Sequence, residues 1–263
     1  MDGIEKSKEI SLPKMFEDEE VTAYKIYDHL WLFEAKKVLP SSIYILEGQE
    51  KTLVIDSGYT VANLPSRVSK VSPKPQILAL THGHHDHSGS IHQYDTIYMN
   101  KDDIKIIKKY NYQGKIVEID EGFIFDLGKI HVQVIKFSGH TEGSIGFLDI
   151  EDRWIFTGDA IGSTCIWMQM TPDPLESLMG AIKRIESIKD KFDEIFIGHY
   201  KAINGPSNIS YVEKMKKLLE NILYVKDYKA DLFTDGPCEE NITVRSKLDE
   251  FEIVYNKNNI FYH

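Results

Sequence analysis

Short apolar runs that stop abruptly at a polar residue dominate the hydrophobic pattern of this chain. Each run is bounded by glycine and is rich in β-branched or aromatic residues, which predicts a buried strand. Because functional side chains gather where strands end and loops begin, we expect the five endings to converge at one sheet edge. The runs 52–55, 77–81, 132–137, 154–158 and 195–198 lead to Asp56, His82, His140, Asp159 and His199.

The same periodicities predict the other elements. Strands are expected at 21–26, 30–33, 42–47, 51–56, 96–100, 115–119, 123–127, 129–137, 144–150 and 153–157. Apolar residues at helical spacing predict helices at 62–70, 90–94, 102–110, 174–189 and 209–224. The polar run 256–259 between the apolar segments 251–255 and 260–262 predicts a closing hairpin. Because no linker or low-complexity tract divides the chain, we expect a flexible leader at 1–20 and a single domain at 21–263.

The densest chemistry of the chain lies directly after the second of these runs. His82, His84, Asp86 and His87 bring three imidazoles and one carboxylate into six positions. Neutral imidazole nitrogens and carboxylate oxygens are the ligands that suit zinc and similar divalent ions. A solvated histidine-rich loop is the alternative. The tight clustering, the preceding apolar run and the following Ser-Gly turn favour a metal site.

The complete set of motifs resembles the metallo-β-lactamase superfamily of metallohydrolases. The family's His-x-His-x-Asp-His motif stands at residues 82–87. Its later single ligands match His140 in Ser-Gly-His-Thr-Glu-Gly-Ser, Asp159 in Phe-Thr-Gly-Asp-Ala and His199 in Ile-Gly-His-Tyr. Asp56, in Leu-Val-Ile-Asp-Ser-Gly, is similar to the first family signature. The resemblance spans residues 21 to 204 and implies an α+β fold, a four-layer αββα sandwich.

The resemblance also implies how the site is arranged. His82, His84 and His140 would hold the first ion. The second ion would be held by Asp86, His87 and His199, and the carboxylate of Asp159 would bridge the two. Two divalent ions about 3.5–4 Å apart can share a hydroxide that attacks a carbonyl, and Asp86 would also orient that hydroxide. Zinc is the expected ion, although manganese and iron tolerate the same ligands. Asp56 is expected to hydrogen-bond a ligand and fix its orientation.

The remaining histidines are expected to be bystanders. Alternation along an extended loop would point His85 away from its neighbours. The other four have no partner spacing and are expected to be surface or half-buried residues: His29, His92, His131 and His263. A serine-nucleophile mechanism has little support, because Ser57, Ser88 and Thr141 have no identified base.

Composition limits the class of partner. The net charge of −10 argues against nucleic acid or an anionic membrane, which leaves a small-molecule substrate. No segment reaches the roughly eighteen apolar residues of a membrane span. Cys165 and Cys238 do not make a disulfide framework, and the charged N-terminal segment does not resemble a secretory signal. A cytoplasmic location is therefore expected, and the oligomeric state stays open.

The resemblance restricts the reaction more than the substrate. True β-lactamases of this superfamily generally lack the bridging aspartate, so Asp159 favours the thioester and lactone hydrolases, of which hydroxyacylglutathione hydrolase is one. We expect hydrolysis of a thioester, lactone or ester. The alternative is a mononuclear iron persulfide dioxygenase, which keeps much the same motif. A β-lactamase, a phosphodiesterase and a metal-binding protein without activity are less favoured.

Residues that contact the substrate are not identified by any motif. Trp167, Met168 and Met170 lie on an expected loop, and they could line the pocket or pack in the core. Tyr59 and Tyr200 are close in sequence to proposed site residues, and the loop 34–41 could flank the entrance. These features fit an apolar acyl group better than a polyanion.

Overall fold

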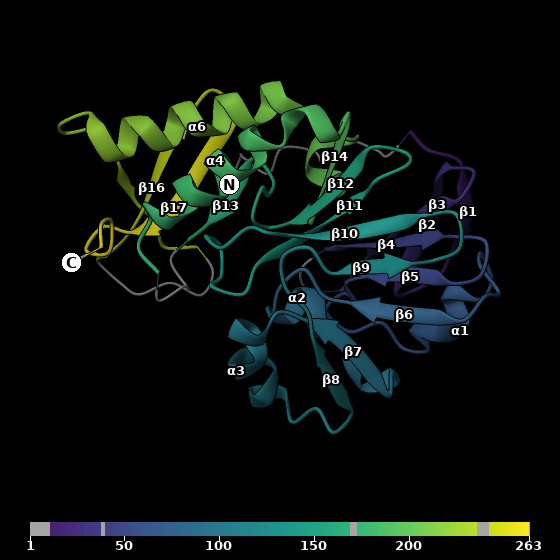
Figure 1. Ribbon diagram of the computed structural model, residues 1–263. Helices are drawn as coiled ribbons and strands as arrows, with labels where there is room; N and C mark the ends of the chain where they lie inside the picture. Colours follow the sequence, from purple (N-terminus) through teal and green to yellow (C-terminus); the bar gives the residue numbers. More distant parts are fainter. Residues whose placement is uncertain (1–10, 38–39, 169–172, 236–241, 263) are drawn as a thin grey trace.

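Two β-sheets lie face to face in the middle of the molecule, and helices cover their outer faces (Figure 1). The computed structural model describes residues 11–37, 40–168, 173–235 and 242–262. The four layers of helix, sheet, sheet and helix confirm the expected α+β sandwich. Within the described residues, no helix combines the length and the apolar character needed to cross a membrane.

In the described part of the chain, the first sheet contains eight strands that follow one another in the order of the sequence. Its first five strands are antiparallel neighbours, and β5 to β8 are parallel. The strands are β1 (Lys14–Glu17), β2 (Val21–Tyr27), β3 (Leu30–Ala35), β4 (Ser42–Glu47), β5 (Thr52–Ile55), β6 (Gln76–Ala79), β7 (Thr96–Met99) and β8 (Lys115–Glu118). Strand β1 lies in the segment expected to be a flexible leader, and that expectation is wrong for residues 14–17 because they pair with β2.

The second sheet has the order β14-β12-β11-β10-β9. Strands β9 to β12 form an antiparallel meander, and β14 joins β12 in parallel. The strands are β9 (Ile124–Asp126), β10 (His131–Lys136), β11 (Ile145–Asp149), β12 (Trp154–Gly158) and β14 (Glu194–Ile197). Strands β10, β12 and β14 therefore present their carboxyl ends at the same end of the sheet.

Alternating side chains of the central strands enter different cores on the two faces of each sheet. In β3, Leu32 enters the core between the sheets, whereas Phe33 enters the core beneath the helices of the first sheet. In the second sheet, Phe156 faces the first sheet and Ile155 faces the helices on the other side. Successive strand residues point to opposite faces. The near-continuous apolar runs of the sequence follow from burial on both faces of these strands.

Short helices cover the first sheet and long helices cover the second. Apolar side chains of α1 (Leu64–Val68) and α3 (Ile104–Ile107) pack on the first sheet, with the single-turn α2 (His85–Ser88) nearby. The second sheet is covered by α4 (Ser177–Ser187) and α6 (Ile209–Tyr224), whose apolar stripes enter a common core. The short α5 (Tyr200–Ile203) follows β14. The expected helix at 102–110 is broken into α3 and two flanking 3-10 turns.

A third sheet, absent from the sequence-based prediction, packs under α6 (Figure 1). Its order is β13 (Cys165–Trp167), β17 (Phe251–Asn256), β16 (Thr243–Leu248) and β15 (Asp231–Leu232). The expected hairpin between 251–255 and 260–262 is wrong, because β17 pairs with the preceding β16 instead. The expected loop around Trp167 is also partly a strand, since β13 pairs with β17.

Candidate metal centre

The five strand endings meet, but they come from two sheets rather than from one. Asp56 and His82 follow β5 and β6 of the first sheet, whereas His140, Asp159 and His199 follow β10, β12 and β14 of the second. The two sheet ends are joined directly by backbone hydrogen bonds, from Ser42 N to Gly198 O at 2.8 Å and from Ile145 N to Thr81 O at 2.9 Å. The expectation of a single sheet edge is therefore corrected to the shared end of two facing sheets.

The first group of ligands consists of His82, His84 and His140. One ring nitrogen from each lies within 4.8 Å of the others, and His140 Nε2 and His84 Nδ1 are 2.9 Å apart. Burial lowers the pKa of all three imidazoles, that of His140 to about 3 and that of His82 well below its usual range. These rings are neutral at pH 7, the state in which imidazole binds a metal ion.

The second group consists of Asp86, His87, Asp159 and His199, whose ligand atoms also lie within 4.8 Å of one another. Asp86 Oδ2 is 3.4 Å from His87 Nε2 and 3.7 Å from His199 Nε2. Burial alone would raise the pKa of Asp86, yet the neighbouring imidazole of His87 holds it down at about 2. Burial alone would lower the pKa of His199, but the neighbouring carboxylate of Asp159 outweighs it and raises this pKa to about 9.

Asp159 lies between the two groups. Its Oδ2 atom is 3.3 Å from His199 Nε2 and 3.9 Å from His140 Nε2, and its Oδ1 atom is 3.5 Å from His87 Nε2. One carboxylate therefore approaches imidazoles of both groups. Burial alone would raise the pKa of Asp159, but His199 and His87 hold it well below its usual range.

Unpartnered atoms show that these residues fit a metal ion. His82 Nε2, His87 Nε2 and Asp159 Oδ1 are buried and have no hydrogen-bond partner within the described part of the chain. Burying such atoms without a partner is unfavourable, and native proteins rarely do so. Metal cations bound among these nitrogen and oxygen atoms would satisfy all three of them. The residues present are therefore of the types that bind zinc.

A helical turn and the carboxylate of Asp56 hold the His-rich segment in place. The short α2 begins after His84, and His87 N donates to His84 O at 3.0 Å. The segment is therefore a helical turn rather than the extended loop expected from the sequence. Asp56 Oδ2 is 2.8 Å from His87 Nδ1, and the same carboxylate accepts from Thr81 N at 2.7 Å. Asp56 thus fixes the ring orientation of His87, so that Nε2 points into the site.

Asp103 is a positioning residue that the sequence did not reveal. Its carboxylate is fully buried and accepts hydrogen bonds from Gly83 N at 2.8 Å, Thr141 Oγ1 at 2.7 Å and Gly143 N at 2.9 Å. It therefore ties the segment between His82 and His84 to the loop that carries His140. In the sequence, Asp103 has no distinguishing signal, because acidic residues are common at the start of a helix.

The segment 34–41, which the sequence suggested could flank the entrance, contacts the centre through its last two residues. Pro40 O accepts a hydrogen bond from His199 Nδ1 at 2.7 Å, and Ser41 Oγ donates to Asp86 O at 2.5 Å. The loop therefore contacts two residues of the second group. Residues 38–39 lie outside the described part of the chain.

His85 is not a member of either group and lies between two tyrosine rings. The ring centroids of Tyr59 and Tyr110 are 4.5 Å and 4.8 Å from that of His85, both in edge-on contact. Burial, followed by the charge of Asp86, raises the pKa of Tyr110. The sequence drew attention to Tyr59 but not to Tyr110. Tyr200 lies buried in the core between the sheets instead of facing a cleft, and burial raises its pKa to about 12.

The proposed wall residues lie elsewhere than expected. Met168 is buried in the core with α4 and α6, and Trp167 packs edge-on against Phe233 at 5.4 Å. Cys165 is half-buried in β13, and burial raises the pKa of its thiol to about 12. Met170 and Cys238 lie outside the described residues.

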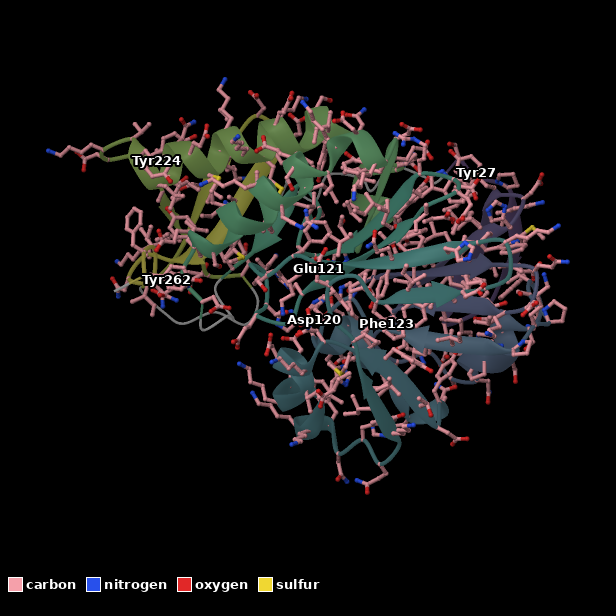
Figure 2. The ribbon with its side chains drawn as sticks, viewed as in Figure 1. Tyr27, Asp120, Glu121, Phe123, Tyr224 and Tyr262 are labelled. Atoms are coloured by element: carbon pink, nitrogen blue, oxygen red, sulfur yellow. The ribbon has the colours of Figure 1, made fainter. Side chains whose placement is uncertain are left out.

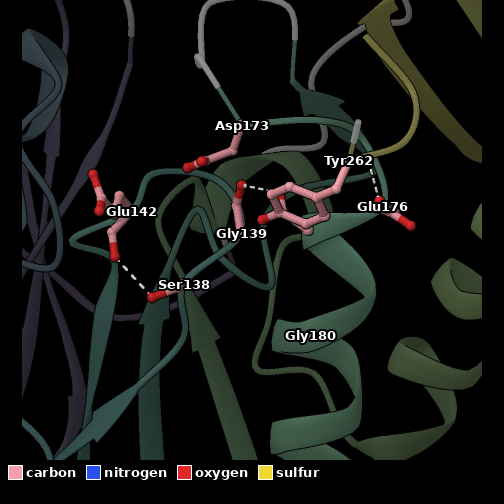
Figure 3. A pocket seen from close by; sticks show the side chains of 8 residues that line it. Ser138, Gly139, Glu142, Asp173, Glu176, Gly180 and Tyr262 are labelled. Atoms are coloured by element: carbon pink, nitrogen blue, oxygen red, sulfur yellow. Dashed lines mark hydrogen bonds between the residues drawn. The ribbon is translucent and has the colours of Figure 1, made fainter.

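A pocket of about 480 Å³ opens beside the loop that carries His140 (Figure 3). Figure 3 shows Glu142, Asp173 and Glu176 around it, with the ring of Tyr262 among them. Gly139 lines this pocket, but the metal-ligand candidates do not. The pocket thus lies next to the metal centre and has an acidic lining, but it does not contain the candidate metal ligands.

The other histidines divide into two kinds. His92 is exposed, whereas His131 is half-buried and pairs with Glu151 at 2.8 Å. His29, for which the sequence indicated no partner, lies beside Asp149 and Asp152. His263 falls outside the described residues.

Comparisons with known proteins agree with this site. The model of the metallo-beta-lactamase superfamily matches residues 37–199. The chain is 21% identical over 223 residues to acyl-coenzyme A thioesterase MBLAC2 of Gallus gallus, covering 70% of this chain and 78% of that protein. It is 27% identical over 136 residues to hydroxyacylglutathione hydrolase GloC of Haemophilus influenzae, covering 44% of this chain and 64% of that protein.

A solved metallo-beta-lactamase from Pontibacter korlensis has the same fold, with a TM-score of 0.65 at 17% identity over 77% of this chain and all of that one. The family match covers the segment from the loop before β4 to His199, and thus every candidate ligand. The chain therefore belongs to the metallo-beta-lactamase superfamily and is a hydrolase of that superfamily.

Proposed function

We propose that this protein is a dinuclear metallohydrolase that hydrolyses acyl thioesters. The position of Asp159 carries the proposal, because its carboxylate approaches His140 of the first group and His199 of the second. A carboxylate shared in this way would hold two cations at a fixed spacing. The relatives named as an acyl-coenzyme A thioesterase and a hydroxyacylglutathione hydrolase support the choice of substrate, since both names denote release of an acyl group from a thiol carrier.

The residues that would hold the ions follow from the two groups. His82, His84 and His140 would bind one ion, Asp86, His87 and His199 the other, and Asp159 both. When bound, such a pair of divalent ions lowers the pKa of a shared water and polarises the carbonyl under attack. We infer zinc as the ion, because neutral imidazoles and carboxylates suit it.

Asp86 is suited to orienting the attacking water. Its carboxylate lies beside two histidines of the second group, and Ser41 holds its backbone carbonyl. With its pKa held near 2, Asp86 is ionised at neutral pH and can accept a hydrogen bond from the water. The same ionisation prevents it from donating a proton to a leaving group.

The leaving group favours a thioester over an amide. A thiol has a pKa of about 8.5, so a thiolate leaves without help from a proton donor. An amine needs a proton as it departs. Asp86 and Asp159 both have lowered pKa values, so neither carboxylate would supply that proton. The net charge of −10 also disfavours phosphodiesters of nucleic acids. We infer that the substrate is a small-molecule thioester, which the protein hydrolyses in the reducing cytoplasm.

An anaerobic activity panel tests this function. The zinc-loaded protein would be assayed without oxygen on acyl-coenzyme A and S-acylglutathione thioesters, with matched oxygen esters and lactones. Oxygen uptake would be measured separately with glutathione persulfide on iron-loaded protein. We expect thioester hydrolysis without oxygen and no oxygen uptake. Oxygen consumption with persulfide and no anaerobic hydrolysis would replace the proposal with the dioxygenase alternative.

A further inference from the structure

A third cluster of metal-ligand side chains lies at the end of the sandwich opposite the metal centre. His29 occupies the turn between β2 and β3, Asp149 ends β11, and Asp152 lies in the turn before β12. One ligand atom from each lies within 4.8 Å of the others. Because β11 is antiparallel to β10 and β12, its carboxyl end is remote from His140 and Asp159.

Asp149 is the unusual member of this cluster. Its side chain is fully buried, and its Oδ1 atom accepts hydrogen bonds from Glu151 N and Asp152 N, both at 3.1 Å. Its Oδ2 atom is buried and has no hydrogen-bond partner among the described residues. Burial, with the charges of Asp152 and Glu151 acting in the same direction, raises the pKa of Asp149 to about 6. A buried carboxylate oxygen with no partner needs a proton or a cation.

The other two members are fixed beside it and are reached from solvent. His29 Nε2 is 2.7 Å from Asp152 Oδ2, and their side chains are 29% and 34% exposed. The ring of His29 stacks on Trp154 with centroids 5.2 Å apart, and Trp154 stacks on Tyr27 at 4.7 Å. Tyr27 marks this end of the molecule in Figure 2, far from Tyr262. The imidazole is therefore held in place by packing, while an ion can enter from outside.

A simple ion pair explains only part of this geometry. A protonated His29 would satisfy Asp152, but it would leave Asp149 Oδ2 unpartnered. We propose that His29, Asp149 and Asp152 bind a divalent transition-metal ion at a site separate from the metal centre. One imidazole nitrogen and two carboxylate oxygens suit Zn²⁺, Co²⁺ or Ni²⁺, with water completing the coordination.

The site would join the two sheets. His29 belongs to a turn of the first sheet, whereas Asp149 and Asp152 belong to the β11–β12 turn of the second. An ion bound by all three links segments about 120 residues apart in the sequence, and it binds the folded chain in preference to the unfolded chain. Its role is therefore to stabilise the fold and not to take part in hydrolysis.

Zinc stoichiometry of the full-length protein tests the site. Metal-free wild type, His29→Gln, Asp149→Asn and His92→Gln proteins would be equilibrated with the same excess of free Zn²⁺ and analysed for bound metal. His92 is the matched control, because it is an exposed histidine remote from the cluster that packs edge-on against Tyr112. We expect His29→Gln and Asp149→Asn to bind one equivalent less than wild type, and His92→Gln to match wild type.

A thermal measurement gives an independent readout. Added Zn²⁺ should raise the Tm of wild type more than that of His29→Gln, while thioester hydrolysis stays the same in both. Equal zinc stoichiometry in wild type and His29→Gln would overturn the proposal and leave His29 and Asp152 as an ion pair. The comparison measures a difference of one ion, so it holds whatever the metal centre itself binds.

Discussion

Asp86 and His85 are sequence neighbours with opposite expected roles. Asp86 belongs to the second ligand group, whereas His85 packs between Tyr59 and Tyr110. The sequence predicts the same division, although the segment is a helical turn and not the extended loop on which that prediction rested. A pair of variants one position apart therefore separates ligand from bystander.

Replacing Asp86 with Asn keeps the shape of the side chain and removes its charge. We expect kcat for thioester hydrolysis to fall by at least about two orders of magnitude, as on loss of a key electrostatic group. His85→Ala should reduce kcat far less. Steady-state kinetics on zinc-loaded proteins measure both. Equal losses in the two variants would contradict the assignment of Asp86.

Asp56 and Asp103 both position the candidate ligands, but only Asp56 could be identified from the sequence. Asp56 stood at the end of an apolar run, where a strand end is visible in the hydrophobic pattern. Asp103 stood in no such place, and its role arises from three hydrogen bonds to loops distant in the sequence. Tertiary contacts of this kind leave no local pattern.

At the scale of elements, close packing at strand ends fixes the ligands. Gly198 lies between β14 and His199, and a Cβ atom there would collide with Asp159 Oδ1 and come within 2.8 Å of His87 Cε1. The backbone at the end of β14 thus passes directly against two residues of the second group. Glycine is required here by space rather than by backbone conformation.

Gly198→Ala is expected to displace Asp159 and His87, and to weaken binding of the second ion by about tenfold or more, as loss of ligand orientation does. Gly205→Ala is the matched control, since a Cβ atom at Gly205 would meet nothing within 4 Å. Competition with a metal indicator reports both affinities. Unchanged zinc affinity in Gly198→Ala would show that the site tolerates the displacement.

Most strands and the two long helices followed from hydrophobic periodicity, because burial on both faces produces continuous apolar runs. Helix 209–224 was predicted with its observed bounds. The third sheet was missed: β16 contains Arg245 and Lys247, which interrupt its apolar character. Pairing of β17 with β16 instead of with residues 260–262 depends on the tight turn at Asp249, where φ is 52°.

At the scale of the whole molecule, the fold and the metal centre are separable. Among the described residues, three apolar cores account for the packing of the sheets and helices, and the candidate ligands lie at the sheet ends outside these cores. Convergence of strands from two sheets could not be foreseen, because the sequence does not say which strands pair. The order of the motifs nevertheless identified the αββα sandwich.

Chelation should therefore leave the protein folded but less stable. We expect far-UV circular dichroism to be unchanged by EDTA at 25 °C, and the Tm to fall by about 10 °C, since ligands that bind the native state contribute a few kcal/mol. Restoring zinc should restore the Tm. Loss of the far-UV signal on chelation would show that the metal, and not the apolar cores, holds the sheets together.

Thioester hydrolysis is proposed to need two ions held by seven residues, with Asp159 between them. The most direct test of this proposal is anaerobic thioester hydrolysis by metal-free protein as Zn²⁺ is added in known equivalents. The His29→Gln variant should be used, because it lacks the proposed peripheral site. Activity is predicted to rise until two equivalents per chain are bound and then to level off. Full activity at one equivalent would contradict the need for two ions, and no hydrolysis at any zinc level would contradict the proposed thioesterase function.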